Sequence, residues 1–242
     1  MKNNNDFILS SITDILKDVV SASAGIGSGI ETYPLCDYIM QSVFLKMTGF
    51  QEQKMKCICW ELATNDYEYR YDFTKTPLGE CSQYKDKYKV YQDLIEQIKK
   101  NKSDFDILAL NKNDILTTTI SEIQNNFSNT NLSIWAQNSF NEFINNNNIQ
   151  VEDFIVLKNA QSAETKLFEN SLKDKYDVLY KHRNSCAHNT KSYQQNLPTL
   201  KILADENYKY ENYFVWFTIL ILIDKVFIEL YKEYLKTLED KI

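Results

Sequence analysis

The stretch "YFVWFTILILI" at residues 213–223 is the most apolar run in this 242-residue chain, and it indicates the fold class. As a helix, eleven residues rise only about 16 Å, at roughly 1.5 Å per residue, which is too short to cross a bilayer. The run is followed at once by Asp224 and Lys225. We therefore expect a helix over 208–236 that is apolar on most faces in its first half and is buried between other helices or in a subunit interface.

The rest of the chain favours helices over a many-stranded sheet. It contains only 5 Gly and 3 Pro, so it has few of the residues that form tight turns between strands. Apolar residues recur at helical spacing in several segments, with an interruption expected at Gly49. These segments are 6–21, 35–62, 81–100, 104–125, 132–144 and 151–188. The pattern predicts an all-α protein built as a helical bundle.

Two further segments bear on the organisation of the chain. "DYEYRYDF" at 66–73 alternates aromatic and charged residues, which fits a short edge strand or a helix that continues from residue 62. "NNNN" at 145–148 is typical of a surface linker. We therefore predict a helical N-terminal region over 1–148 and a second domain over 149–242.

Composition excludes some classes of function. The formal net charge is -6 and the isoelectric point is about 5.1, so non-specific duplex binding is not expected, although one local basic pocket could still meet RNA. The first 20 residues are polar and then amphipathic, unlike a secretory signal. Five cysteines without regular spacing indicate a reducing, cytoplasmic environment.

Two short motifs offer weak signals for ligands. Cys57 and Cys59 form a C-x-C pair, for which buried thiols are a better interpretation than a zinc site, because no second pair or finger-like histidines accompany it. The glycines at 25, 27 and 29 lack the Lys-Ser/Thr of a phosphate-binding loop and the strand of a dinucleotide site. We interpret them as a connector and expect neither a metal nor a cofactor.

The stretch "YKHRNSCAHN" at 180–189 holds both histidines of the chain, His182 and His188. On a helix Asn184 and His188 are four residues apart and share a face. Arg183 and His188 are five apart, about 140° around the axis, so one helix directs them to neighbouring sides. Two copies of the chain that meet at this helix end would bring the groups together better than one copy does.

Within this stretch "RNSCAH" resembles the R-x4-H signature of HEPN-domain ribonucleases, with Asn184 after the arginine as in that family. The surroundings are similar too: a long helix ending in the motif, a loop of about 20 residues and a strongly apolar helix, so that the resemblance covers about 150–236. It implies a helical bundle that dimerises with two motifs facing one cleft. Many members are metal-independent endoribonucleases of toxin–antitoxin, abortive-infection and CRISPR-linked defence systems.

The resemblance implies roles for particular residues. RNA cleavage by its own 2′-hydroxyl needs a base, an acid and a group that stabilises charge on phosphorus. His188 from each subunit would supply acid and base, Arg183 would hold the phosphate, and Asn184 would orient His188 or bind the phosphate. The remaining candidates would contact RNA: Lys181, His182, Lys191 and Tyr193. Partners would be RNA, a second copy of the chain and an antitoxin or defence-complex protein, with no membrane.

Other interpretations stay open. Basic residues near a helix C-terminus complement its dipole, although Arg183 lies more than a turn before residue 188. The chain could also be a non-catalytic HEPN-like module that binds a partner or nucleotide, or a structural subunit of a defence complex. Family toxins that carry H-x-Y are controlled by modification of the tyrosine, whereas here Asn189 and Thr190 follow His188, so that control is not expected. Residues 1–148 would regulate the domain or select its substrate.

Overall fold

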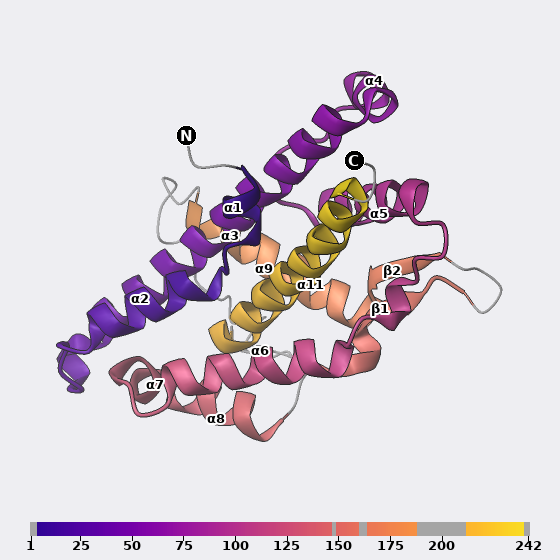
Figure 1. The fold of residues 1–242 in the computed structure, drawn as a ribbon. Helices are drawn as coiled ribbons and strands as arrows, with labels where there is room; N and C mark the ends of the chain where they lie inside the picture. The colour runs from indigo at the N-terminus through magenta and orange to yellow at the C-terminus, as the bar shows by residue number, and fades with distance from the viewer. Residues whose placement is uncertain (1–3, 147–148, 160–163, 188–211, 240–242) are drawn as a thin grey trace, which may run out of the picture.

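The computed structural model describes residues 4–146, 149–159, 164–187 and 212–239, and these are predominantly α-helical (Figure 1). The all-α prediction is confirmed, with one small two-stranded sheet added to it. The helices before residue 100 are α1 (Asn4–Leu9), α2 (Thr13–Ser23), η1 (Ile30–Thr32), α3 (Tyr33–Asn65), α4 (Tyr67–Lys75) and α5 (Tyr84–Asn101). The later elements are η2 (Ile107–Ala109), α6 (Lys112–Phe127), α7 (Asn131–Trp135), α8 (Gln137–Asn145), η3 (Val151–Asp153), β1 (Phe154–Leu157), β2 (Thr165–Phe168), α9 (Asn170–Ala187) and α11 (Tyr213–Glu239).

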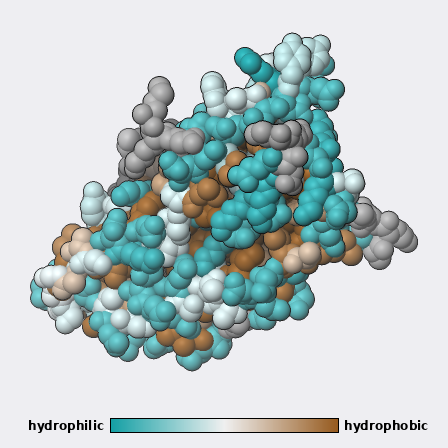
Figure 2. Space-filling view, in the orientation of Figure 1, coloured by the Kyte–Doolittle hydropathy of each residue, from teal (hydrophilic) through white to brown (hydrophobic). Residues whose placement is uncertain are grey.

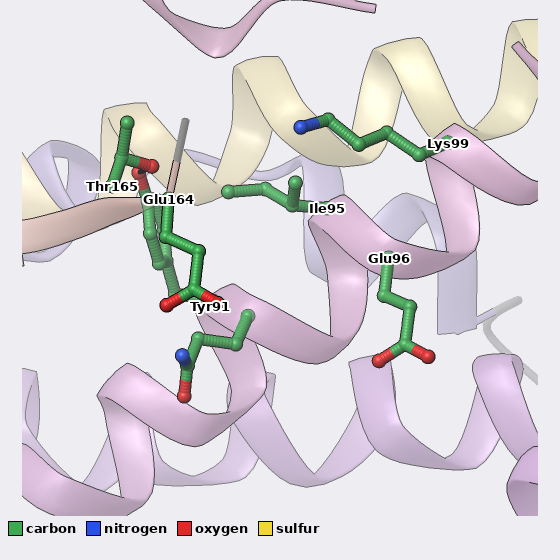
Figure 3. Close-up of a pocket in the computed structure, with 7 residues that line it drawn as sticks. Tyr91, Ile95, Glu96, Lys99, Glu164 and Thr165 are labelled. Atoms are coloured by element: carbon green, nitrogen blue, oxygen red, sulfur yellow. Dashed lines mark hydrogen bonds between the residues drawn. The ribbon is translucent and has the colours of Figure 1, made fainter. Parts of the chain in front are cut away.

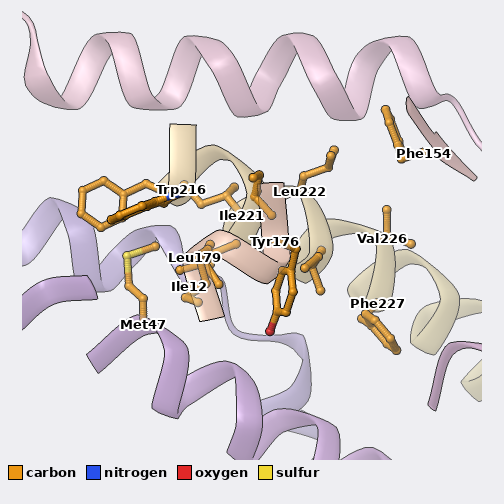
Figure 4. Packing of buried hydrophobic residues seen from close by; sticks show 14 of the residues in the cluster. Ile12, Met47, Phe154, Tyr176, Leu179, Trp216, Ile221, Leu222, Val226 and Phe227 are labelled. Carbon is orange, nitrogen blue, oxygen red and sulfur yellow. The ribbon is translucent and has the colours of Figure 1, made fainter. Parts of the chain in front are cut away.

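The apolar run lies in α11, which is the central helix of the fold. It packs against α1, α3, α5, α6, α8 and α9. Nearly every residue from Tyr213 to Phe227 is buried, so the predicted burial within protein is confirmed. Figure 4 shows Trp216 and Ile221 of α11 in the same cluster as Met47 of α3 and Leu179 of α9. No helix among the described residues has the length and apolar character needed to cross a membrane.

Helix α3 runs without a break through Gly49, so the predicted interruption is wrong. One interior glycine costs only about 1 kcal/mol relative to alanine. The turns on either side bury Met47 and Met55 completely, and this packing holds the helix together. A methyl group built at Gly49 would meet no atom within 4 Å, so no close approach of a neighbouring element explains the glycine.

The alternating segment at 66–73 is helical, which settles the choice between a strand and a helix. Asp66 ends α3 in an extended conformation, and its carboxylate accepts a hydrogen bond of 2.9 Å from the Tyr69 amide. This side chain is therefore the N-cap of α4, the usual role of Asp at a helix start. Tyr69 and Phe73, four residues apart on α4, pack against the core, whereas Tyr67 and Tyr71 are exposed.

The segment predicted as one helix over 151–188 contains a β-hairpin directly after the short η3, and this is a correction. β1 and β2 pair antiparallel, with Phe154 opposite Phe168 and Val156 opposite Lys166. "FIVL" and "TKLF" have four residues each, and so short a stretch has too few positions to separate a strand from a helix by its apolar spacing. The described α-helix of that segment is α9, Asn170–Ala187.

Helices α5 and α6 cover the two edges of this small sheet. The Phe168 amide donates to the Tyr84 hydroxyl at 3.0 Å, and the Tyr91 hydroxyl lies 2.8 Å from Thr165 Oγ1. On the other edge Lys112 Nζ donates to the carbonyls of Phe154 and Ile155 at 3.3 and 3.2 Å. Backbone groups that two strands leave unpaired are thus satisfied by side chains.

Three predicted helices have different boundaries. The segment expected over 6–21 is divided at residues 10–12 into α1 and α2. The segment expected over 104–125 contains η2 and then α6, which begins only at Lys112, where the Asn111 side chain accepts from the Asp114 amide at 3.1 Å. The segment expected over 132–144 is divided at Ala136 into α7 and α8. At the start of α6 the cap residue Asn111, and not the apolar spacing, determines where the helix begins.

A fully buried ion pair connects distant parts of the fold. Lys54 Nζ on α3 lies 2.5 Å from Asp224 Oδ1 on α11, and both side chains are 0% exposed. Lys54 also donates to the Ser10 carbonyl at 2.5 Å, and the Ile12 amide donates to Asp224 Oδ2 at 3.0 Å. The pair therefore joins α3, α11 and the connection between α1 and α2.

Elements from both sides of residue 148 share one core. Buried residues of α3, α5 and α6 belong to the same hydrophobic cluster as those of β2, α9 and α11. The predicted boundary at 148 therefore runs through a common core among the described residues. On the face shown in Figure 2, hydrophobic side chains lie between polar ones across the middle of the molecule.

Candidate functional site

Helix α9 carries the part of the R-x4-H motif that the structure describes. Leu172, Tyr176 and Leu179 are the buried residues of this helix, and they hold it against the core. The Tyr176 hydroxyl donates to the Ser82 carbonyl at 2.7 Å, which fixes α9 to the segment before α5. His188, Asn189, Lys191 and Tyr193 lie outside the described residues, so the structure does not place these predicted site residues.

Arg183 and Asn184, which were predicted to act together, are in direct contact. Arg183 Nη1 donates to Asn184 Oδ1 at 3.1 Å. Both carboxylate oxygens of Glu52, on α3, lie 3.1 Å from Arg183 Nη2. The side chains of Arg183 and Glu52 are 21% and 12% exposed, so the pair lies at the edge of the solvent. Glu52 thus fixes one end of the guanidinium, while Asn184 contacts the other.

Lys87 is a second cation next to this pair. It is buried, and its Nζ donates to the Cys81 carbonyl at 2.9 Å. Burial lowers the pKa of Lys87 from 10.5 to about 8, while the carboxylate of Glu52 opposes that shift and the charge of Arg183 adds to it. Glu52 therefore balances two cations, one on α9 and one on α5.

Lys56 and Glu80 extend the charged network toward the solvent. These two residues form a salt bridge between α3 and the segment before α5. The ammonium of Lys56, to which it is hydrogen-bonded, lowers the pKa of Glu80, and the charge of Arg183 contributes to the same shift. The network therefore contains three cations and two carboxylates from α3, α5, α9 and the segment between α4 and α5.

Tyr180 adds a neutral hydroxyl to the same turn of α9. Its hydroxyl accepts a hydrogen bond of 3.3 Å from Gln83 Nε2, at the start of α5. Hydrogen bonding to Asn184, and then to Gln83, lowers the pKa of the Tyr180 phenol, and the positive charge of Arg183 lowers it further. Tyr180, Arg183 and Asn184 thus form one polar surface on α9.

The guanidinium of Arg183 is not fully paired. Its Nε is buried and has no hydrogen-bond partner within the described part of the chain. An arginine has five N–H donors, and the contacts above use those of Nη1 and Nη2 only in part. Because Nε is buried, it cannot reach an anion in solvent; the remaining N–H donors of Nη1 and Nη2 are the groups of Arg183 suited to such an anion.

His182 points to a different side of α9 from Arg183. Its ring lies among Phe44, Tyr213 and Trp216, with the Trp216 centroid 4.5 Å away. His182 Nε2 lies 2.9 Å from the Tyr213 hydroxyl and 3.3 Å from Cys186 Sγ. This environment joins α9 to α11 and separates His182 from the Arg183 network, whereas Lys181 is exposed.

Glu52, Lys87, Tyr180 and Gln83 were not predicted from sequence. Glu52 and Lys87 lie in ordinary amphipathic helices, and no motif surrounds them. Glu52 is 131 positions from Arg183 along the chain. Tyr180 could have been found, because it precedes Arg183 and Asn184 by three and four residues and therefore shares their side of a helix.

A separate hollow lies between α5 and β2, with a volume of about 380 Å³. Its lining includes Ile95 and Lys99 of α5 together with Glu164 and Thr165 of the hairpin (Figure 3). None of its lining residues belongs to the Arg183 network. The hollow lies beside the edge of β2 where Tyr91 contacts Thr165.

The described residues contain no group of three or more His, Cys, Asp or Glu side chains placed to share a metal ion. Cys59 is buried, and burial raises the pKa of its thiol to about 12, which disfavours the thiolate that a metal would need. Cys57 is only partly buried. Cys59 therefore has the character of a structural thiol.

Comparison with known proteins identified no relative: no protein-family model, no curated protein and no solved structure matches the chain.

Proposed function

We propose that the chain is a metal-independent endoribonuclease of HEPN type, which cleaves RNA by attack of the 2′-hydroxyl in a cleft formed by two copies of the chain. One observation carries the proposal: Arg183 and Asn184 lie in contact on the solvent edge of α9, where the Nη1 and Nη2 groups of the guanidinium have N–H donors beyond those that contact Asn184 and Glu52. Arginine offers the fork of donors that suits phosphate.

The chemistry is divided between residues of the motif. Arg183 holds the scissile phosphate and stabilises the charge that develops on it, with Asn184 beside it. His188 of one copy accepts the 2′-hydroxyl proton, and His188 of the other protonates the leaving 5′-oxygen. Lys181, which is exposed, lines the path of the RNA together with Lys191 and Tyr193, and His182 contributes on the side of α11. The biological role is a toxin or antiphage effector in the cytoplasm, held by an antitoxin or defence-complex protein.

The test is cleavage of RNA by the pure protein in chelator. We expect products with 2′,3′-cyclic phosphate ends, and loss of activity in both Arg183→Ala and His188→Ala with unchanged thermal unfolding. Full activity in His188→Ala would reject the mechanism. A monomer by light scattering that still cleaves RNA would reject the shared cleft.

The second candidate is a non-catalytic binding or structural module. It is favoured by the ion pair of Arg183 with Glu52. Because this pair joins α9 to α3, a structural role alone would explain the presence of the arginine. In that case the protein forms a stable complex with its partner, and replacement of Arg183 and His188 leaves the biological effect intact. Toxicity or phage protection measured in cells with both variants separates the candidates.

A further inference from the structure

We propose that Tyr180 is a phosphodiester-binding residue of the Arg183 site, a neutral donor that contacts a phosphate held by Arg183 and Asn184. The inference rests on the proposed function for the identity of the ligand as RNA. It adds a residue that the R-x4-H pattern does not contain and a segment, the start of α5, that lies far from the motif in sequence.

The helix geometry brings the three side chains together. Tyr180 is three residues before Arg183 and four before Asn184, and residues at these spacings are neighbours on a helix surface. Arg183 and Asn184 are adjacent in sequence, and the hydrogen bond of 3.1 Å draws their side chains together. All three side chains are partly exposed, in contrast to Tyr176 and Leu179 on the inner side of the same helix.

The orientation of the polar atoms explains why Tyr180 would donate. The hydrogen bond with Asn184 lowers the pKa of the Tyr180 phenol, as a bond donated to the phenol oxygen does, and the Asn184 amide nitrogen can donate it while Oδ1 accepts from Arg183. Gln83 Nε2 also donates to the Tyr180 oxygen. A phenol oxygen that accepts from amides keeps its own O–H proton for an acceptor, and a phosphate oxygen is such an acceptor.

The electrostatic surroundings also favour donation by the Tyr180 hydroxyl. The phenol of Tyr180 has a lowered pKa, because of hydrogen bonds with Asn184 first, then Gln83, and also Ser82, and a more acidic O–H is a stronger hydrogen-bond donor. The charged groups of the surrounding network are Glu52 and Lys56 on α3, Glu80 in the preceding segment, Lys87 on α5 and Arg183 on α9. Arg183 is the charge that acts directly on the Tyr180 phenol.

The closing experiment measures binding, so it does not depend on cleavage. The probe is a short fluorescent RNA in which every 2′-hydroxyl is methylated, so that the attacking group is absent. Fluorescence anisotropy gives its dissociation constant for the wild type, Tyr180→Phe and Arg183→Gln. We expect about a 10- to 150-fold weaker affinity in Tyr180→Phe, corresponding to the loss of one donor to a charged group.

Salt dependence separates a neutral contact from a charged one. We expect Arg183→Gln to reduce the slope of log K against log salt by about 0.7, the value for one phosphate contact on a single strand. Tyr180→Phe should weaken binding and leave that slope unchanged. A general distortion of the site by Tyr180→Phe would change both quantities, and such a change would overturn the proposal.

The matched control is Tyr71→Phe, which removes the same oxygen from an exposed tyrosine on α4. Thermal unfolding of both variants checks the fold, and Gln83→Leu, which removes a donor to Tyr180 but keeps its phenol, should have a smaller effect than Tyr180→Phe. Unchanged affinity in Tyr180→Phe overturns the proposal, as does a wild type that does not bind the methylated RNA. Binding with no cleavage of ordinary RNA would reject only the proposed ribonuclease activity.

Discussion

The buried pair of Lys54 and Asp224 makes a quantitative prediction about stability. Replacing Asp224 with Asn leaves a lysine without its counter-ion at a site where both side chains are 0% exposed. It also removes a carboxylate that accepts from Lys54 at 2.5 Å and from the Ile12 amide at 3.0 Å. Breaking a buried pair from one side costs about 3–5 kcal/mol, so we expect Asp224→Asn to lower the free energy of unfolding by that amount.

The same geometry predicts that the ion pair adds little to the free energy of unfolding when it is compared with a pair of apolar residues at the two positions. Desolvation lowers the pKa of Lys54 and raises that of Asp224, so in both groups burial outweighs the attraction between them and the folded state disfavours the charged form. We therefore expect Lys54→Met combined with Asp224→Leu to be more stable than Asp224→Asn alone. The Ser10 carbonyl and the Ile12 amide lose partners in the double variant, which limits the recovery by about 1–3 kcal/mol for each group.

Urea and thermal unfolding measure these differences. For a chain of this size each kcal/mol corresponds to about 2–4 °C, so Asp224→Asn should lower Tm by about 6–20 °C. Asp14→Asn is the control, because Asp14 and Lys17 form an exposed pair worth less than about 1 kcal/mol. A loss below about 1 kcal/mol in Asp224→Asn, or a double variant less stable than the single one, would refute the reasoning.

Three other outcomes are expected. Gly49→Ala should raise the free energy of unfolding by about 0.5–1 kcal/mol in urea titrations, because the added methyl meets open space inside a helix; a destabilised variant would contradict the packing described for α3. The pKa of Lys87 is about 8 in the folded protein and near 10.5 in the unfolded chain. The stability that this difference contributes is complete above pH 10.5 and is lost as the pH falls toward 8, because the buried side chain then has to carry its charge. Urea titrations at pH 8, 9 and 10 should therefore show a smaller rise of stability with pH in Lys87→Met, and an equal rise in both proteins would count against the burial of this ammonium. A double-mutant cycle of Glu52→Gln and Arg183→Gln should give a coupling free energy of about 1 kcal/mol, and additive effects would mean that the ion pair contributes nothing.

The fold class, most of the helices and the candidate site residues on α9 could be predicted from the sequence alone. Local spacing carries this information, because residues three and four apart share a face and an apolar face has to be buried. The run at 213–223 therefore predicted a long buried helix, and the motif placed Arg183 and Asn184 together as candidates, although their direct hydrogen bond was not predicted. The spacing of Tyr180 contained the same signal, although no motif drew attention to it.

Only the tertiary structure decided which distant groups meet the motif. Glu52 is 131 positions from Arg183, and Lys54 is 170 positions from Asp224. These pairings depend on how α3, α5, α9 and α11 pack, which periodicity does not specify. The hairpin at 154–168 was missed for a related reason, since its strands are too short to show a period and are stabilised by side chains of α5 and α6. The spacing of apolar residues predicts which face of a helix is buried, because that spacing is a local property of the chain. Polar partners distant in sequence meet only because the helices pack in a particular way, and the spacing does not specify that packing.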